Sequence, residues 1–321
     1  MQKLLITDYL SPNVVKTAKT IFDVTESYDI PTANLMKIIG QYDALICRSQ
    51  TQLTENVIQE GITGRLKIVV SVTSGMAHID IAYAQKVGLK VCNTPWGVTN
   101  ANAEFNIGAL IALTRKFVSA TDYMRQGIWD QQKVIGNEIS GKNLGIVSFG
   151  RIGKKTAQYA SAFDMRIFAY DPYVERKAFA QAHVQRVGLV ELMSESDFII
   201  VNVALTPDTI NMITAKELTL MKPTAYIVQV SRGRVIDESA LIEALRTHAI
   251  AGALIDVYVN EPHFDSRFTE LSNVILTPHI ACSTLEAREI VGEFALDEVK
   301  RFFVGENLQS EFVPPKFTVT Q

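Results

Sequence analysis

Short apolar runs and amphipathic segments alternate along nearly the whole chain of 321 residues. In its first third, the runs KLLIT, DALIC, KIVVS and LKVC have the length and aliphatic content of strands. Residues 13–20 and 79–86 lie between such runs and have the apolar spacing of helices. Continuous apolar strands separated by helices are typical of a parallel sheet with both faces covered.

The same pattern starts again at residue 143. The runs LGIVS, RIFAY, DFIIVNV, AYIVQV, GALIDV and VILT predict six strands of a second parallel sheet. Residues 102–117 before this sheet and 284–303 after it predict two long helices with apolar stripes. We therefore predict a discontinuous first domain, residues 1–98 and 287–321, and a second domain, residues 99–286.

The stretch NLGIVSFGRIGKKTAQYA, residues 143–160, reads as a strand, a glycine turn and a helix. It keeps two of the three glycines of a dinucleotide-binding turn, Gly150 and Gly153, and has Ser148 at the position of the first. We expect Ser148 to have a negative φ, so that its side chain causes no strain. The helix that starts at Arg151 and Ile152 offers free N–H groups to a phosphate. On its own, the pattern also fits an ordinary turn between a strand and a helix.

Asp171 strengthens the nucleotide interpretation. It ends the next predicted strand, 21 residues after Gly150, where a dinucleotide fold places the carboxylate that binds the ribose hydroxyls. Such an acid repels a 2′-phosphate, which favours NAD over NADP. The predicted fold is therefore α/β with two Rossmann-like parallel-sheet domains. The first is discontinuous and flavodoxin-like, and the second is a doubly wound dinucleotide-binding domain.

Four polar residues follow later strands of the second sheet: Arg232, Asp256, Glu261 and His279. Ligands of open α/β sheets bind at the carboxyl ends of the strands, which is where these residues are expected to meet. Each of them also has a structural explanation, as a loop arginine, a turn cap or an ordinary loop residue. Their coincidence at one sheet edge favours a catalytic site.

Composition narrows the class of protein. The net charge of −3 gives no reason to expect nucleic acid or an anionic membrane as a partner. No apolar run reaches membrane-spanning length, and the apolar stretch at the start of the chain is too short for a signal peptide. The three cysteines match neither a metal site nor a disulfide framework, so we expect no metal and a cytoplasmic location. Cys282, close to His279 in the chain, is more typical of a packed thiol than of a reactive one.

These motifs together resemble the D-isomer-specific 2-hydroxyacid dehydrogenases. DFIIVNVALTPDTINMI and MKPTAYIVQVSRGRVIDESALIEAL resemble two family signatures, and LIDVYVNEP and LTPHIACST follow in the family's order. The resemblance implies a catalytic set of Arg232, Glu261 and His279, with His279 as acid/base and Glu261 fixing its tautomer. It implies that Arg232 binds the substrate carboxylate and polarises the carbonyl.

The resemblance also implies the remaining site residues. NAD is the expected cofactor, and its binding residues are Ser148, Gly150, Arg151, Ile152, Gly153, Asp171, Val203, Ala204, Thr206 and Asp256, the last of them at the nicotinamide carboxamide. A small 2-keto or 2-hydroxy acid is the expected substrate. It would be bound by the backbone of SVTSGMAHID at Ser74, Gly75 and Met76, and by Arg48 and Ser49 of CRSQTQLT. Arg48 hints at a phosphorylated or otherwise doubly anionic substrate.

Several residues depart from the family pattern. Besides Ser148, they are Asn202 and Ala204, where many members have His and Pro, Gln229, where Asn is usual, and Trp96, where Gly is frequent. Trp96 would narrow the substrate cleft. The others bear on the cofactor loops and leave the catalytic set intact.

Two other functions remain open. The first is a formate- or phosphite-type dehydrogenase, which shares the fold. In formate dehydrogenases the catalytic histidine pairs with a glutamine, so Glu261 argues against that activity. Phosphite oxidation is not excluded by Glu261. An NAD(H)-sensing corepressor-like binding protein also keeps the three catalytic residues. The apolar helix at 102–117 suggests a homodimer face, although burial in the core explains it equally well.

Overall fold

The computed structural model describes residues 1–313, which form two compact units. Among these residues, the first unit comprises Met1–Val98 and residues 283–313, and the second comprises Thr99–Cys282. The sequence prediction placed the return to the first domain at residue 287, four residues later than the division between the units. Residues 314–321, which the prediction assigned to the first domain, lie outside the described residues.

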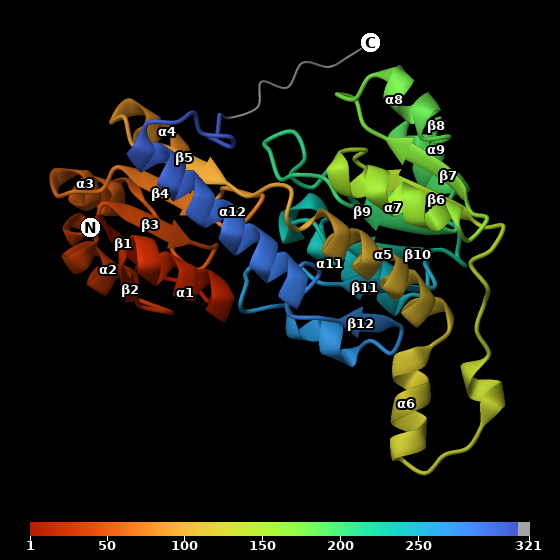
Figure 1. The fold of residues 1–321 in the computed structure, drawn as a ribbon. Helices are drawn as coiled ribbons and strands as arrows, with labels where there is room; N and C mark the ends of the chain where they lie inside the picture. Colours follow the sequence, from red (N-terminus) through yellow and green to blue (C-terminus); the bar gives the residue numbers. More distant parts are fainter. Residues whose placement is uncertain (314–321) are drawn as a thin grey trace. The chain divides into compact units, whose positions relative to one another are not determined.

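Unit 1 is built on a five-stranded parallel sheet with the order β2-β1-β3-β4-β5, which is the flavodoxin-like order (Figure 1). The strands run in register, so that Ile6 of β1 pairs with Ile46 of β3, and Cys47 of β3 with Ser71 of β4. The predicted fold class is therefore confirmed for this unit. The strands are β1 Lys3–Ile6, β2 Asp23–Glu26, β3 Ala44–Cys47, β4 Ile68–Ser71 and β5 Lys90–Asn93.

Helices cover the sheet of unit 1. They are α1 Pro12–Ile21, α2 Thr32–Ile38, η1 Ile39–Gln41, α3 Glu55–Thr63, α4 Ile81–Lys86 and α12 Leu285–Val304. The last helix comes from the far end of the sequence and packs against α1 and the sheet, which closes the discontinuous domain. Thr284 caps its first turn by accepting a hydrogen bond from the N–H of Ala287.

Unit 2 contains a seven-stranded parallel sheet with the order β12-β11-β10-β9-β6-β7-β8. The chain reverses its direction of growth between β6 and β9, and this switch point is where doubly wound folds bind their ligands. The predicted fold class is confirmed here as well. The strands are β6 Asn143–Val147, β7 Arg166–Tyr170, β8 Gln185–Arg186, β9 Phe198–Val201, β10 Tyr226–Gln229, β11 Gly252–Ile255 and β12 Val274–Leu276.

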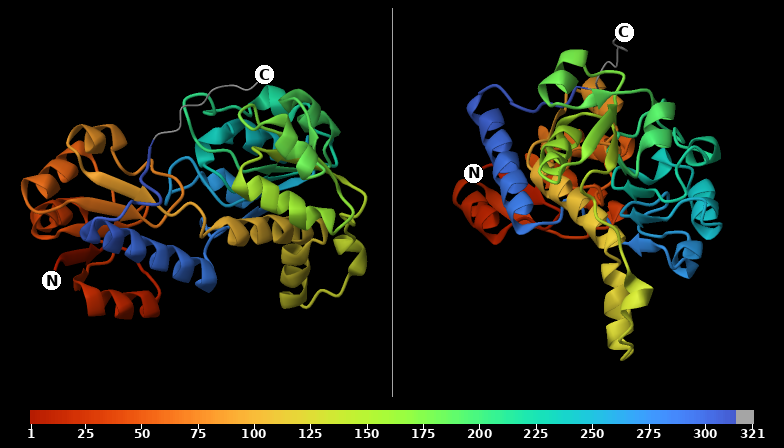
Figure 2. Two further views of the ribbon diagram at one scale, coloured as in Figure 1. Left: turned by 45° about the horizontal axis from the view of Figure 1, so that its top comes forward. Right: turned by 90° about the vertical axis from the view of Figure 1, so that its right-hand side faces the viewer.

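The helices of unit 2 lie on both faces of this sheet (Figure 2). They are α5 Thr99–Thr114, α6 Phe117–Arg125, η2 Gln131–Val134, α7 Arg151–Ser161, α8 Arg176–Gln181, α9 Leu189–Glu195, α10 Ala215–Leu218, η3 Gly233–Val235, α11 Glu238–Arg246 and η4 Ser266–Glu270. Ile107, Leu110 and Leu113 of α5 are buried in the core against α7 and the sheet. The apolar stripe predicted at 102–117 therefore packs inside the unit, as the core interpretation expected.

Residues 115–136 form an arm that leaves unit 2 and returns to it. At its base, the Asn137 N–H donates to the Thr114 carbonyl at 3.0 Å. No residue of α6 is buried, and Figures 1 and 2 show this helix extending away from the sheet. Phe117 and Trp129 are 53% and 78% exposed. The arm thus presents apolar side chains that unit 2 itself does not cover.

Candidate active site

Three neighbouring strands of unit 2 bring the predicted catalytic residues to one edge of the sheet. Gln229 of β10 pairs with Ile255 of β11, which in turn pairs with Leu276 of β12, so the three strands end at the same level. Arg232 follows β10, Asp256 and Glu261 follow β11, and His279 follows β12. Residues far apart in sequence therefore converge because parallel strands share a carboxyl edge.

His279 and Glu261 form a direct pair. The Nδ1 atom of His279 lies 2.7 Å from Oε2 of Glu261, and each side chain is about one-third exposed. The other carboxylate oxygen, Oε1, accepts the N–H of Tyr258 at 2.9 Å. An ionised carboxylate can only accept, so Nδ1 of His279 carries a proton and Nε2 faces away from this pair, free for exchange.

The surroundings keep Glu261 ionised. Burial alone would raise its pKa, but the hydrogen bonds from His279 and Tyr258, together with the charges of His279 and Arg232, outweigh burial and leave the pKa below its ordinary value. Burial lowers the pKa of Arg232, which the charge of Glu261 opposes. A guanidinium remains charged at any physiological pH, so the site combines a fixed cation with a histidine–carboxylate pair.

Gln229 shapes the loop that carries Arg232. Its amide Nε2 donates to the Arg232 carbonyl at 2.9 Å, and its Oε1 accepts from Ser231 Oγ at 3.0 Å. Arg232 also donates from Nη1 to the Ser231 carbonyl at 2.7 Å. The departure from the family's usual Asn at position 229 thus has a structural role here, because the side chain closes the loop on itself.

Asp256 is fully buried and holds the segment that carries His279. Its carboxylate accepts from Thr277 Oγ1 at 2.6 Å and from the N–H groups of Ile280 and Ala281 at 2.8 and 2.9 Å. Burial raises the pKa of Asp256, and these hydrogen bonds oppose the shift. The expectation that this acid contacts the nicotinamide stays a prediction. The structure adds a second role, which is fixing the backbone on the carboxyl side of His279.

The glycine turn differs from the expectation at Ser148. The residue has a φ of +79°, in the left-handed region that favours glycine, so the predicted negative φ is wrong. The reason is close packing, because a Cβ on Gly153 would lie 2.3 Å from the Ser148 carbonyl oxygen. The chain must turn sharply at position 148 to let α7 approach β6, and the serine takes up this conformation at an energetic cost.

Asp171 braces the same turn. Its Oδ2 accepts the Phe149 N–H at 2.9 Å and the Ser148 hydroxyl at 3.3 Å, and its Oδ1 accepts the Tyr173 N–H at 2.9 Å. The side chain lies at the end of β7, next to the turn, as the sequence predicted. It is only 8% exposed, so any ribose hydroxyl would share a carboxylate that already stabilises the loop.

The residues around the turn fit a dinucleotide. Gly150 and Arg151 at the start of α7 are exposed, and no side chain caps the helix, which is the arrangement of a helix N-terminus that binds a phosphate. In the loop that follows β9, Val203 and Thr206 are half-buried and Ala204 is exposed. Thr209 holds this loop by donating to the Ala204 carbonyl at 2.7 Å.

Unit 1 carries the predicted substrate-binding residues at the carboxyl edge of its own sheet. Ser74 and Gly75 are half-buried, while Met76 is buried and its side chain is packed in the core. Arg48 follows β3, and its buried Nε has no hydrogen-bond partner among residues 1–313. Ser49 is exposed. The loop and Arg48 are therefore polar groups with unmet hydrogen-bonding capacity.

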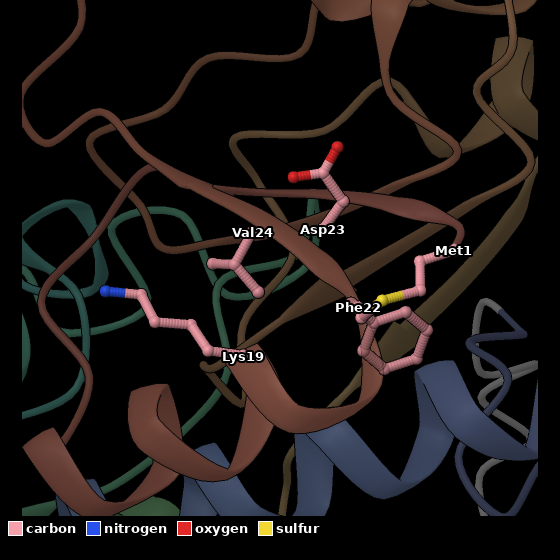
Figure 3. Close-up of a pocket in the computed structure, with 5 residues that line it drawn as sticks. All are labelled: Met1, Lys19, Phe22, Asp23 and Val24. Carbon is pink, nitrogen blue, oxygen red and sulfur yellow. The ribbon is translucent and has the colours of Figure 1, made fainter.

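A pocket elsewhere in unit 1 has none of these features. Met1, Lys19, Phe22, Asp23 and Val24 line it, at the amino ends of β1 and β2 (Figure 3). It lies at the opposite edge of the sheet from Arg48 and Ser74. Its position and its mixed side chains suggest no chemistry related to the site.

The fold and this site define a dinucleotide-binding α/β protein with a histidine–carboxylate pair. Residues 107–281 match the family model described as "D-isomer specific 2-hydroxyacid dehydrogenase, NAD binding domain". The chain therefore belongs to the D-isomer-specific 2-hydroxyacid dehydrogenase family of NAD-dependent oxidoreductases, which act on CH–OH groups. Among the described residues, no helix has both the length and the apolar character needed to cross a bilayer.

Individual relatives support this assignment. The chain is 38% identical to a glyoxylate reductase of Pyrococcus furiosus over 316 residues, covering 95% of this chain and 93% of that one. It is 37% identical to a D-3-phosphoglycerate dehydrogenase of Synechocystis over 305 residues, but spans only 55% of that protein's length. A D-lactate dehydrogenase from Aquifex aeolicus, solved with NAD and lactic acid, matches with a TM-score of 0.83 and 27% identity, covering 94% and 96% of the two chains.

Two features of the site were not foreseen from the sequence. The N–H of Tyr258 orients Glu261, and Gly233 lets the Arg232 loop approach the backbone of Tyr258 and Val259. The sequence offered a signal for the role of Gly233, because it directly follows a candidate catalytic arginine. It offered none for the N–H of Tyr258, because any residue except proline supplies the same N–H.

Proposed function

We propose that this chain catalyses NAD-dependent interconversion of a small 2-keto acid and its D-2-hydroxy acid. The observation that carries this proposal is the 2.7 Å pair between His279 Nδ1 and Glu261 Oε2, located beside Arg232 at the carboxyl edge of a dinucleotide-binding sheet. When bound, the nicotinamide cofactor supplies or accepts the hydride. The protein must then supply a proton, a carboxylate site and a fixed orientation.

His279 is the proposed proton donor and acceptor. Since Glu261 accepts the Nδ1 proton, the atom that exchanges a proton with substrate is Nε2. In the reductive direction, the carbonyl carbon gains the hydride and the carbonyl oxygen gains the proton from Nε2, which leaves a neutral imidazole. In the oxidative direction, the neutral imidazole removes the hydroxyl proton as the hydride leaves.

Arg232 is proposed to bind the substrate's carboxylate and to polarise the reacting carbonyl. Its planar guanidinium can donate two hydrogen bonds to a carboxylate. In unit 1, Ser74, Gly75 and Met76 are proposed to bind a substrate carboxylate through backbone N–H groups, and Arg48 and Ser49 are proposed as further substrate-binding residues. The relatives named above act, by their names, on glyoxylate and on D-3-phosphoglycerate, and both kinds of acid are candidates for this chain.

Spectrophotometry tests the proposed function directly. The purified protein is mixed with NADH and glyoxylate, pyruvate, hydroxypyruvate or 3-phosphohydroxypyruvate, and the absorbance of NADH is followed. Turnover of at least one acid supports the proposal, and preference for the phosphorylated acid would agree with the expectation that Arg48 binds a second anionic group. Tight NADH binding without turnover of any acid would contradict it and favour an NADH-sensing protein instead.

We also propose that the chain forms a homodimer in a cytoplasmic setting. Support for the dimer comes from the arm, residues 115–136, because large exposed apolar groups such as Phe117 and Trp129 are costly to leave in water. Light scattering measures the mass in solution. A monomer at micromolar concentration, or a Trp129→Lys variant that remains a dimer, would argue against this use of the arm.

A further inference from the structure

The loop that follows β4 in unit 1 has two peptide groups held by side chains behind it. Thr73 Oγ1 donates to the Gly75 carbonyl oxygen at 2.7 Å, and Asn93 Nδ2 donates to the Ser74 carbonyl oxygen at 3.0 Å. Thr73 itself is fixed, because its carbonyl accepts the Thr94 N–H at 3.2 Å. Two consecutive carbonyls therefore point toward the interior of unit 1.

The orientation of these carbonyls sets the direction of two N–H groups. In a trans peptide, the C=O and the N–H of the same plane point in opposite directions. Fixing the Ser74 carbonyl therefore directs the Gly75 N–H to the other side, and fixing the Gly75 carbonyl does the same for the Met76 N–H. In the part of the chain that the structure describes, neither N–H has a hydrogen-bond acceptor. Two adjacent donors of this kind suit a carboxylate.

A longer chain of hydrogen bonds lies behind Thr73. Ser71 Oγ is 2.8 Å from Thr73 Oγ1 and 3.0 Å from Nε2 of His78. Ser71 is fully buried and His78 is 7% exposed, so water cannot easily replace either partner. The chain therefore runs from a buried histidine through two hydroxyls to the Gly75 carbonyl.

The proton order in this chain follows from counting donors. The single hydroxyl proton of Thr73 is donated to the Gly75 carbonyl, which can only accept. Ser71 must then donate its own proton to Thr73. With that proton used, Ser71 can only accept from His78, so Nε2 of His78 must carry a proton. Only one direction, from His78 to Ser71 to Thr73 to Gly75, satisfies every partner.

We propose that His78, Ser71 and Thr73 are positioning residues whose ordered hydrogen bonds aim the N–H of Met76 at the carboxylate of the substrate, next to the Gly75 N–H that Asn93 directs through the Ser74 carbonyl. The proposal rests on the proposed function, since it assigns the ligand as a 2-keto or 2-hydroxy acid. It adds three residues that need not touch that ligand. It also assigns a fixed protonation site to a buried histidine outside the catalytic set.

The first test separates this role from simple stability. Thr73→Val keeps the shape of the side chain and removes its hydroxyl, whereas Thr73→Ser keeps the hydroxyl. Thr7→Val is the matched control, because Thr7 is a buried threonine of the same sheet edge whose hydroxyl bonds Thr51 and not the loop. The measured quantities are KM and kcat for the best 2-keto acid, the Kd of oxamate in the presence of NADH, and the Kd of NADH.

We expect Thr73→Val to raise KM and the oxamate Kd by about tenfold or more, because a lost buried hydrogen bond releases the Gly75 peptide. The NADH Kd and kcat should change by less than about twofold, as should all constants of Thr73→Ser and Thr7→Val. A Thr73→Val variant that binds oxamate like the wild type would overturn the proposal. Oxamate binding keeps this test valid even if no 2-keto acid is turned over.

The second test needs neither activity nor a variant at Thr73. The chain has five histidines, so the imidazole nitrogens can be resolved by nitrogen-15 NMR and His78 assigned from a His78→Gln sample. We expect Nε2 of His78 to be protonated at neutral pH and to lose its coupling pattern in Ser71→Ala. If the wild-type protein instead has the proton of His78 only on Nδ1, the proposed order of hydrogen bonds is wrong. This outcome does not depend on whether the protein turns over any 2-keto acid.

Discussion

Gly233 and Tyr258 are in backbone contact: a Cβ built on Gly233 would lie 2.1 Å from the carbonyl carbon of Tyr258. Arg232 precedes this glycine, and the N–H of Tyr258 holds Glu261. The contact therefore ties the loop of the arginine to the loop of the glutamate. No side chain larger than hydrogen fits there without separating the two loops.

Gly233→Ala should consequently reduce kcat/KM by about 100-fold or more, because a displacement of about 1 Å at catalytic groups is costly. It should also lower the midpoint of thermal unfolding. Gly108→Ala is the control, since a Cβ at position 108 meets no atom within 4 Å. Steady-state kinetics and thermal unfolding of both variants check this, and an unimpaired Gly233→Ala enzyme would show that the contact is unimportant.

His279→Ala should lower kcat by roughly 10²- to 10⁴-fold, the usual contribution of a positioned acid/base. The affinity for NADH should change little, because proton transfer is lost and the cofactor-binding turn is untouched. Stopped-flow turnover and fluorescence titration of NADH measure the two quantities. His248→Asn, in an exposed turn where the residue has a φ of +53°, is the control for replacing a histidine. Retained turnover in His279→Ala would remove His279 from the mechanism.

Ser148 is held at a φ of +79°, so two variants at this position separate strain from hydrogen bonding. Ser148→Ala loses the bond to Asp171 and keeps the strain, whereas Ser148→Gly loses the bond and the strain together. We expect the glycine variant to be more stable than the alanine variant by about 1 kcal/mol in urea unfolding. Equal stabilities would indicate that the left-handed conformation costs nothing here.

Asp171→Ala should weaken the binding of NADH much more than the binding of NADPH. The carboxylate is proposed to accept hydrogen bonds from the ribose hydroxyls and to repel a 2′-phosphate. Its removal should therefore raise the Kd of NADH by about tenfold or more. Because Asp171 also accepts the Phe149 N–H, the variant should be less stable than the wild type. Equal losses for both cofactors would mean that Asp171 only braces the turn. Calorimetric titration with each cofactor distinguishes these outcomes.

Glu261→Gln should show its effect on stability in a defined pH range. The folded-state pKa of Glu261 lies below its ordinary value of 4.5, so ionisation stabilises the fold above that pH. The advantage of wild type over Glu261→Gln should be constant above pH 4.5 and disappear as the pH falls through the depressed pKa. Urea unfolding at a series of pH values measures this. If the wild type instead became more stable relative to Glu261→Gln as the pH falls, the pKa of Glu261 would be raised by folding and not lowered.

Several features of this protein follow from its sequence alone. The continuous apolar runs predict the buried strands, because a strand covered on both faces has no polar side to interrupt it. The glycine turn, the acid after the next strand and the order of Arg232, Glu261 and His279 predict a nucleotide fold and its catalytic edge. The edge strands β2 and β8 escaped prediction, since β2 is the polar sequence DVTE and β8 is only two residues long.

Other features were decided by the tertiary structure. The left-handed φ of Ser148 arises because α7 packs closely on β6, and nothing local to a serine requires it. The proton order from His78 to Gly75 depends on side chains that meet only when β4, β5 and the loop are folded together. Local sequence determines which segments become strands and helices, because periodicity is a local property. Which lone pair faces which proton is determined by packing between distant segments, and that information exists only in the folded chain.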